Sequence, residues 1–292
     1  MATSGASPTK TVASRGSAPT LSTRSAPRWA EPTGGRRRPR RRAAGAPTRS
    51  QRGVQVAGRV HPARRNFHGR RHGKSLRASQ RAYLEHDLRA LRVPGVEWDE
   101  NPERRPIDPA TLFGDDRPVW LEVGFGGGEH MVHQAARNPD VGIIGCEPFI
   151  NGVAMLLGKI RAAGTGNIAI HPGDVRDLFD VLPDQSIDRA FLLYPDPWPK
   201  KRHHKRRFVT PEHLVPLARV MKPGAIFRVA TDIPDYVRQT LEEVPRAGFA
   251  WLAERPADWR EPWPDWIPTR YEQKALREGR VPHYLTFRRE GA

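Results

Sequence analysis

Glycines and acidic residues follow three of the short apolar runs in this sequence, where buried strands would end. The run at 119–124 leads into a glycine-rich segment at 124–128, and Glu147 closes the next run roughly 20 residues later. Gly173-Asp174 follows a third run. Glycines let a ligand approach the backbone because they carry no Cβ, and an acid after the second run typically accepts hydrogen bonds from ribose hydroxyls. These residues therefore predict a nucleoside-binding site.

The residue that follows the glycines bears on which nucleoside cofactor fits. Glu129 stands where the dinucleotide fingerprint G-x-G-x-x-G has its third glycine. A carboxylate at this helix N-terminus disfavours a pyrophosphate, whereas a cofactor that carries an ammonium and a sulfonium tolerates a negative site. Together with Glu122, Glu147 and Asp174, the pattern favours S-adenosylmethionine over a nicotinamide cofactor. Alternatively, Glu147 could have only a structural role, next to the N-cap of the helix that follows Pro148.

A basic tract follows the fourth apolar run. Residues 200–207 hold six Lys or Arg and two His, directly after Tyr194-Pro195-Asp196-Pro197-Trp198-Pro199. Such a cluster is typical of a surface that positions RNA through its phosphates, and a solvated loop is the alternative. Trp198 is suited either to stack on a base or to pack beside the prolines. The side chains of adjacent His203 and His204 cannot easily share a metal, so we expect none.

An alternating pattern of strands and helices must position these residues. Apolar runs predict strands, and stretches of helical period predict helices between them. Strands that alternate with helices form a mostly parallel sheet covered on both faces, which is an α/β fold whose strand ends meet at one edge. We also expect a short helix at 79–91 and a connector at 94–118. The expected strands are 119–124, 141–146, 167–171, 187–193, 225–230 and 249–253, and the expected helices are 128–137, 150–163, 211–221 and 235–247.

Charge divides the chain unevenly. It has 292 residues and a net charge of +17, and residues 1–75 hold 18 Lys or Arg against a single acid, Glu31. We predict that residues 1–65 form a disordered basic N-terminal extension and that residues 66–292 form one folded domain. The extension could act as an electrostatic arm for nucleic acid, or it could be a poorly constrained addition. A transit peptide is disfavoured because the segment shows no amphipathic period.

Composition excludes several classes of protein. The single cysteine, Cys146, rules out a disulfide framework and a cysteine-based zinc site, and its place in a predicted buried strand indicates an inert core residue. No run approaches the roughly 18 apolar residues that a membrane-spanning helix needs. The first residues lack the apolar block of a secretory signal. We therefore expect a cytoplasmic protein that makes no membrane contact.

The segment 194–200 closely resembles the signature of one protein family. An aromatic residue, Pro-Asp-Pro-Trp-Pro-Lys and a basic tail are typical of bacterial tRNA (guanine-N7-)-methyltransferases. The likeness extends to the Leu-Glu-x-Gly-x-Gly turn, to Ala230-Thr231-Asp232 and to Thr269-Arg270-Tyr271-Glu272, and it covers roughly residues 66–290. The resemblance implies a class I S-adenosylmethionine-dependent methyltransferase fold, a Rossmann-like, seven-stranded and mostly parallel sheet whose last strand, at 283–289, is antiparallel. It also implies tRNA as the partner and N7 of the variable-loop guanosine 46 as the methylated atom.

The resemblance assigns roles to the matching residues. Asp196 becomes the expected catalytic residue, although guanine N7 already presents a lone pair and needs no strong general base. We expect a monomer. The expected cofactor-binding residues are Glu122, Gly124, Gly126, Glu147, Asp174 and Asp196. The expected substrate-binding residues are Lys200, Asp232, Thr269, Arg270, Tyr271 and Glu272. The expected RNA contacts are Arg202, His203, His204, Lys205, Arg206 and Arg207.

Two other functions remain open at this point. Amino-group methyltransferases carry Asp/Asn-Pro-Pro-aromatic at the same strand end, and residues 195–198 match that tetrapeptide less well. The second alternative is an RNA-binding protein that has lost the cofactor, because one sheet architecture supports many functions. Trp263 and Trp266 lie in a proline-rich loop that could close over the site.

Overall fold

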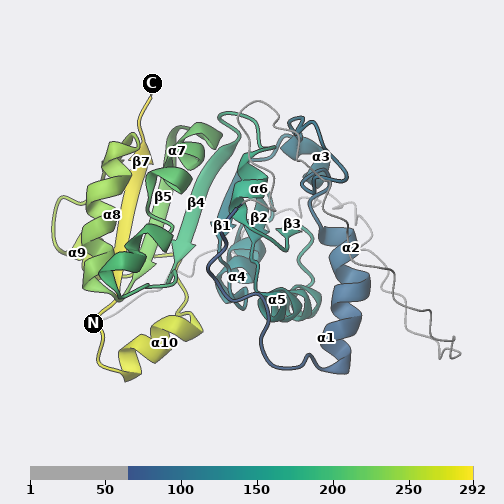
Figure 1. Ribbon diagram of the computed structural model, residues 1–292, viewed down its shortest axis with the longest axis horizontal. Helices are drawn as coiled ribbons and strands as arrows, with labels where there is room; N and C mark the ends of the chain where they lie inside the picture. The colour runs from purple at the N-terminus through teal and green to yellow at the C-terminus, as the bar shows by residue number, and fades with distance from the viewer. Residues whose placement is uncertain (1–64, 292) are drawn as a thin grey trace, which may run out of the picture. The chain divides into compact units, whose positions relative to one another are not determined.

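The computed structural model describes residues 65–291 (Figure 1). The extension predicted at 1–65 lies outside these residues except for Arg65, which pairs with Asp177 and Asp180 at 2.6 and 2.5 Å. Between residues 65 and 291 no helix is long and apolar enough to cross a membrane.

Seven strands form one sheet, in the order β3-β2-β1-β4-β5-β7-β6. Strands β1 to β5 are parallel, and β7 lies antiparallel between β5 and β6. The predicted class I methyltransferase sheet with an antiparallel last strand is confirmed. The strands are β1 Val119–Val123, β2 Gly142–Cys146, β3 Ile168–His171, β4 Ile187–Leu193, β5 Met221–Thr231, β6 Phe249–Trp251 and β7 His283–Arg289.

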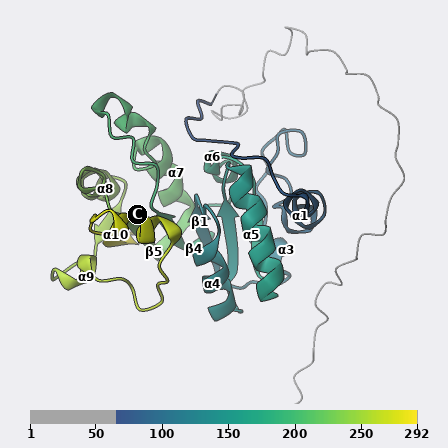
Figure 2. The same cartoon turned by 90° about the horizontal axis from the view of Figure 1, so that it is seen from below.

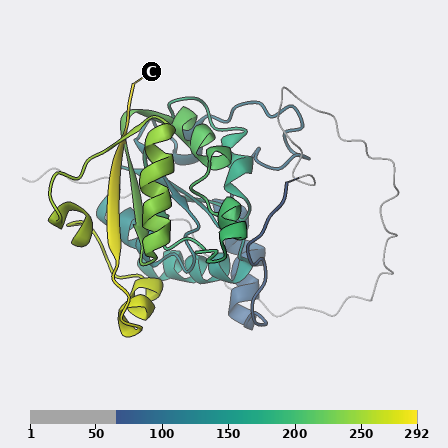
Figure 3. The same cartoon turned by 60° about the vertical axis from the view of Figure 1, so that its left-hand side comes forward.

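Helices cover both faces of this sheet (Figure 2). On one face lie α4 Glu129–Arg137 and α5 Ile150–Ala163, with α1 Ala78–Ala82 and η2 Tyr83–Asp87 packed against α5 and α2 Leu88–Leu91 against β3. The other face is covered by α6 Val175–Phe179, α7 Pro211–Val220 and α8 Pro234–Arg246 (Figure 3). The remaining helices are α3 Pro109–Phe113, η3 Lys201–Arg206, α9 Ala257–Arg260 and α10 Arg270–Arg277.

Strand periodicity decides which side chains of β1 reach which helices. Leu121 and Val123 belong to the core that includes Leu217 of α7, whereas Trp120 packs with Leu157 of α5. Successive side chains of a strand point to opposite faces, so Glu122 lies on the same face as Trp120, toward α4. This placement brings an acid to the helix that follows the glycine turn.

The sequence predictions missed four α-helices and the 3₁₀ helix η3. Within the expected connector at 94–118, α3 begins at an Asp108 side chain that accepts a hydrogen bond from Ala110 N, and it ends at Gly114 with φ 80°. Asp-Pro before a helix and Gly after it are ordinary cap signals, but the segment has too little apolar period to reveal five helical residues. The helices α6, α9 and α10 were also missed, and all three are short.

Candidate functional site

Glycines in the left-handed region build the turn between β1 and α4. Gly124, Gly126 and Gly128 have φ values of 69°, 56° and 76°, which L side chains rarely adopt. Gly126 N donates to Oε2 of Glu147 at 2.8 Å, and Phe149 N donates to Oε1 at 2.9 Å. Glu147 thus ties the glycine turn to the start of α5, and each of its oxygens keeps a second lone pair for a ligand.

The charge of Asp196 contributes to the pKa of both Glu147 and Tyr271, so the three side chains, here called the crevice, lie near one another. Burial raises the pKa of Glu147 to about 6; two backbone N–H groups oppose the rise, and the charge of Asp196 adds to it. Burial also raises the pKa of the Tyr271 hydroxyl, with further contributions from Glu147 and Asp196. Desolvation raises the pKa of Asp196 itself, and Arg70 opposes that rise. The segment after β4 and the start of α10 therefore both face the glycine turn.

The segment after β4 is strained at both ends. Tyr194 and Trp198 have φ values of 49° and 40°, although neither is glycine, and such strain tends to gather at functional sites. Three neighbours hold the indole of Trp198: the Arg206 guanidinium lies 5.0 Å from its ring centroid, and the rings of His68 and His203 approach edge-on at 6.3 and 5.9 Å. Trp198 is half-buried among these side chains, and both packing beside the prolines and stacking on a base stay predictions.

Arg207 corrects one sequence prediction. Its side chain is 1% exposed, its Nε donates to Pro197 O at 2.8 Å, and its Nη1 pairs with Asp235 at 2.8 Å and donates to Gln239 Oε1 at 2.9 Å. The interpretation of Arg207 as an RNA contact is wrong. The basic tract forms the 3₁₀ helix η3, and the chain that leaves this helix turns Arg207 inward.

The rest of the basic tract is accessible to different degrees. His203, His204 and Arg206 are partly buried, and His204 lies 3.2 Å from Asp235. The fully exposed members, which are free to meet a phosphate backbone, are Lys200, Lys201, Arg202 and Lys205.

The first turn of α10, a helix that lies below β4 in Figure 1, approaches the glycine turn. Thr269 caps the helix by accepting from Glu272 N at 3.2 Å. Arg270 pairs with Glu129 at 2.5 Å, and its guanidinium lies where a Cβ on Gly127 would stand. The ring of Tyr271, at 3.1 Å from the position of a Cβ, approaches Gly126 less closely than Arg270 Nη2 approaches Gly127. A side chain at position 127 would therefore displace Arg270, and the positive φ of Gly126 disfavours a side chain there.

Glu272 lies beneath this helix turn rather than at the surface. It is 4% exposed, and its carboxylate accepts from Trp266 Nε1 at 2.7 Å and from Tyr284 Oη at 2.5 Å. Burial and the carboxylate of Glu272 raise the pKa of Tyr284. Trp263 is also buried and donates through Nε1 to Thr286 Oγ1 at 2.9 Å. Both tryptophans thus belong to the packed interior beside Tyr284.

Asp174 and Asp232 already have basic partners. Asp174 caps α6 by accepting from Arg176 N at 2.9 Å and pairs with the Arg176 guanidinium at 2.6 Å. Burial raises the pKa of Asp174, but the contacts with Arg176 outweigh it and leave the pKa low. Asp232 pairs with Arg280 at 2.5 Å. Any ligand of these two acids must share them with an arginine.

Residues 66–74 run along the same edge of the sheet, which the sequence alone did not indicate. Gly73 N donates to Asn151 Oδ1 at 2.7 Å, Asn151 Nδ2 donates to Lys74 O at 2.7 Å, and Ile150 N donates to Arg71 O at 3.0 Å. Backbone hydrogen bonding of this kind leaves no local sequence pattern. The segment brings the charge of Arg70 close to Asp196.

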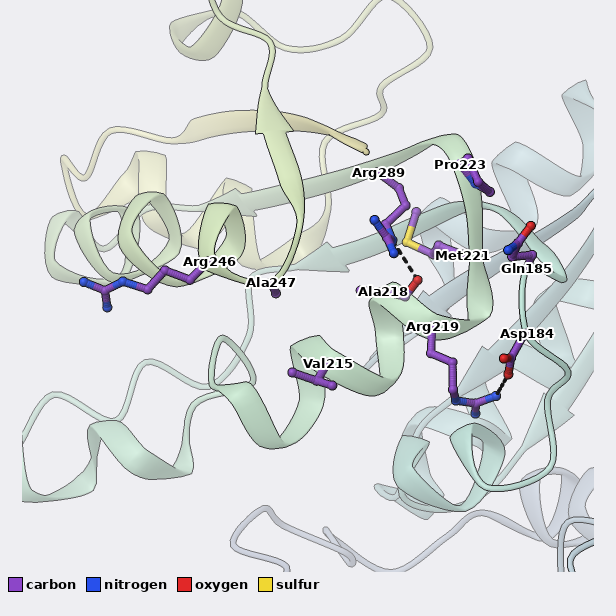
Figure 4. Close-up of a pocket in the computed structure, with 10 residues that line it drawn as sticks. All are labelled: Asp184, Gln185, Val215, Ala218, Arg219, Met221, Pro223, Arg246, Ala247 and Arg289. Carbon is purple, nitrogen blue, oxygen red and sulfur yellow. Dashed lines mark hydrogen bonds and ion pairs between the residues drawn. The ribbon is translucent and has the colours of Figure 1, made fainter. Parts of the chain in front are cut away.

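Two cavities lie at opposite edges of the sheet. A cavity of about 430 Å³ lies at the amino ends of β4 and β5, where Arg219 pairs with Asp184 and Arg289 donates to Ala218 O at 2.9 Å (Figure 4). Ligands of parallel sheets bind at the carboxyl ends of the strands. This cavity is therefore not the candidate site, although it is the larger of the two. A cavity of about 20 Å³ lies at that carboxyl edge and is lined by Glu122, Gly124, Phe125, Glu129, His130, Leu193, Thr269 and Tyr271.

Known proteins resemble this chain over most of its length. The model of a family described as "Putative methyltransferase" matches residues 116–285. The tRNA (guanine-N(7)-)-methyltransferase of Ruegeria pomeroyi is 78% identical over 226 residues, which are 77% of this chain and 95% of that protein. The protein of the same name from Paracoccus denitrificans is 76% identical over 228 residues, with 78% and 96% covered. The Rhizobium meliloti protein of that name is 48% identical over 225 residues, with 76% and 94% covered.

The burial of Arg207 gives a test of stability. We expect Arg207→Ala to lower the free energy of unfolding by about 2–4 kcal/mol, because it leaves the Pro197 carbonyl and the neighbouring acid without their donor. Lys205→Ala, two residues earlier on the exposed face, should change it by less than about 0.5 kcal/mol. Urea unfolding followed by circular dichroism measures both values. Equal effects of the two substitutions would contradict the structural role of Arg207.

Proposed function

The chain belongs to the tRNA (guanine-N(7)-)-methyltransferase family, and on that premise we propose that it methylates N7 of guanosine 46 in the variable loop of tRNA with S-adenosylmethionine. One observation supports this most strongly: the charge of Asp196, four residues before the start of the basic tract, acts on Glu147, which lies under the glycine turn. The donor site and the nucleic-acid surface are thus adjacent.

The residues of the crevice fit the chemistry of S-adenosylmethionine. Glu147 presents free lone pairs to ribose hydroxyls, and the buried carboxylate of Glu122 suits an ammonium group. A cavity of about 20 Å³ holds a water molecule rather than a nucleoside. Because Arg270 and Tyr271 lie over Gly127 and Gly126, we infer that the first turn of α10 moves when the cofactor enters.

The reaction needs alignment more than proton transfer. S-adenosylmethionine supplies a methyl group bonded to a positively charged sulfur. The lone pair of guanine N7 forms the new N–C bond while the C–S bond breaks and its electron pair leaves with the sulfur. We propose that Asp196 either holds the guanine edge by accepting from N1–H and the exocyclic amine, or offsets the positive charge that develops on the imidazole ring of the base. Arg70 favours the ionised form of this carboxylate.

The amino-group methyltransferase alternative loses its support, because the relatives that cover most of this chain carry the guanine-N7 name. We propose further that the protein acts in the cytoplasm, where its tRNA substrate is made. A monomer suffices for the proposed site, since Glu147, Asp196 and Tyr271 all come from one chain.

We expect Asp196→Ala to lose most methyl transfer to tRNA, at least about 100-fold in kcat, because it removes the group that aligns or stabilises the reacting base. Binding of tRNA, measured by filter retention, should change by less than about threefold, because phosphate contacts dominate affinity. Asp116→Ala, which removes an exposed acid shortly before β1, serves as the control. Near wild-type turnover of Asp196→Ala would remove Asp196 from the catalytic role.

The raised pKa of Glu147 gives a pH dependence with a definite sign. The carboxylate is ionised above its pKa of about 6 and protonated below it. We therefore expect the affinity for S-adenosylhomocysteine to fall as the pH drops through 6, approaching tenfold per unit if only the ionised form binds. Glu147→Gln cannot ionise and should bind weakly with a flat profile. Calorimetry between pH 5 and 8 decides, and a flat wild-type profile would contradict this role of Glu147.

The exposed part of the basic tract predicts a salt effect. Replacing Lys201, Arg202 and Lys205 with alanine should reduce the slope of log affinity for tRNA against log salt by about 2 to 3, because each phosphate contact contributes roughly 0.7 to 0.9. Replacing Lys222 and Arg246, which lie at the opposite edge of the sheet, should leave the slope unchanged. Identical slopes for the two sets would show that the tract does not meet phosphates.

A further inference from the structure

A buried chain of polar side chains runs behind the glycine turn. Glu122 on β1 and His130 and Gln134 on α4 are 2%, 2% and 1% exposed. Oε2 of Glu122 lies 2.7 Å from His130 Nδ1, and Nε2 of His130 lies 3.2 Å from Gln134 Nε2. None of these contacts is required for the sheet to form, and buried polar groups of this kind need a reason.

The amide of Gln134 can adopt only one orientation. Its Nε2 donates to Asp265 O at 2.9 Å, and its Oε1 accepts from Asn138 Nδ2 at 3.3 Å. Asn138 is itself oriented, because its Nδ2 also donates to the Gln134 carbonyl at 2.8 Å. Turning the Gln134 amide over would set two oxygens against each other at Asp265 and two NH₂ groups against each other at Asn138. The NH₂ group of Gln134 therefore faces His130.

This orientation decides where the proton of His130 lies. An NH₂ group can only donate, so Nε2 of His130 must accept and the ring proton must be on Nδ1. Nδ1–H then donates to Glu122 Oε2. The rings of Phe191 and Trp266, with centroids 4.8 and 5.3 Å from that of His130, hold the imidazole in this plane. An imidazolium would set an N–H against the NH₂ group of Gln134.

A neutral His130 leaves the negative charge of Glu122 uncompensated. Among the residues that the structure describes, Oε1 of Glu122 has no hydrogen-bond partner, and Glu122 lines the small cavity at the carboxyl edge together with Thr269. The other titratable groups near His130 are Glu129, His133 and Asp265. Burial lowers the pKa of His133, and the charge of Arg137 lowers it further, so His133 adds no positive charge here at neutral pH.

We propose that Gln134 and His130 are positioning residues that keep Glu122 both oriented and fully charged for the ammonium group of the methyl donor. This inference rests on the proposed function, because it needs Glu122 to face that ammonium. Gln134 fixes the tautomer of His130, and His130 fixes one oxygen of Glu122, so the other oxygen meets the ligand with its full charge.

Gln134→Glu tests the relay. The new carboxylate at position 134 can accept a hydrogen bond from an Nε2–H of His130 and so stabilises the imidazolium form of that ring. The positive charge of the imidazolium then offsets the negative charge of Glu122. We expect the affinity for S-adenosylhomocysteine, measured by calorimetry, to fall about tenfold at pH 7 and to recover as the pH rises. Affinity for 5′-methylthioadenosine, which has no ammonium, should not change, and neither should KM for tRNA. Gln134→Met removes the donor without supplying an acceptor for an imidazolium, so it should lose less affinity than Gln134→Glu and show no recovery with pH.

His130→Asn supplies the rescue, since the Asn amide can donate to Glu122 and cannot become charged. The double variant Gln134→Glu/His130→Asn should recover affinity for S-adenosylhomocysteine and show no pH dependence. A loss that is independent of pH, or a loss in Gln134→Met as large as that in Gln134→Glu, would overturn the relay, as would wild-type affinity of a folded Gln134→Glu variant.

Long-range ¹H–¹⁵N NMR of the histidine rings separates this proposal from the proposed function. The His130 signal, identified by its absence in His130→Asn, should report the Nδ1–H tautomer in the full chain without any ligand. An Nε2–H tautomer or an imidazolium at pH 7.5 would overturn the relay alone. A wild-type chain that binds no S-adenosylhomocysteine would overturn the proposed function and with it the role of the relay, even if the tautomer is as expected.

Discussion

The site depends on one buried carboxylate that joins two strand-to-helix turns. Glu147 accepts from Gly126 N in the first turn and from Phe149 N in the second, so neither turn can shift without the other. The left-handed glycines permit this approach because they carry no Cβ. Burial leaves the carboxylate with a raised pKa, and a ligand that donates hydroxyl groups would relieve that unfavourable environment. Glu147 thus holds the two turns together and, in the function that we propose, also binds the cofactor.

The rest of the crevice is held in place by buried side chains that bond to its neighbouring segments. Arg207 donates to the carbonyl of Pro197 and so supports the strained segment that carries Asp196. Glu272, between Trp266 and Tyr284, anchors the first turn of α10 from below. His130 holds one carboxylate oxygen of Glu122 in place through its contact with Nδ1. Supporting contacts of this kind keep reacting groups in place, which matters most for a reaction governed by alignment.

The sequence indicated the features that depend on local pattern. Glu147 and the glycines could be found because their spacing follows from the geometry of a β-α-β unit. Asp196 could be found because its neighbours form a distinctive motif. Arg207 could not, since its burial depends on Asp235 and Gln239 of α8, which the fold brings to it from later in the chain. The two donors to Glu272 are Trp266 and Tyr284, which lie outside its own helix. The segment 66–74 is likewise held by Asn151, which lies far from it in the sequence. Contacts between distant segments leave no period in the sequence.

The account stands on the transfer of a methyl group to one nitrogen of one nucleoside. The most direct measurement is mass spectrometry of nucleosides and mapped oligonucleotides from an unmodified tRNA transcript, after incubation with the full chain and S-adenosylmethionine. We expect N7-methylguanosine in the variable-loop fragment that contains position 46, and no other methylated nucleoside. A methylated adenosine, a methyl group on a guanosine elsewhere, or no incorporation by a chain that binds tRNA would contradict the account.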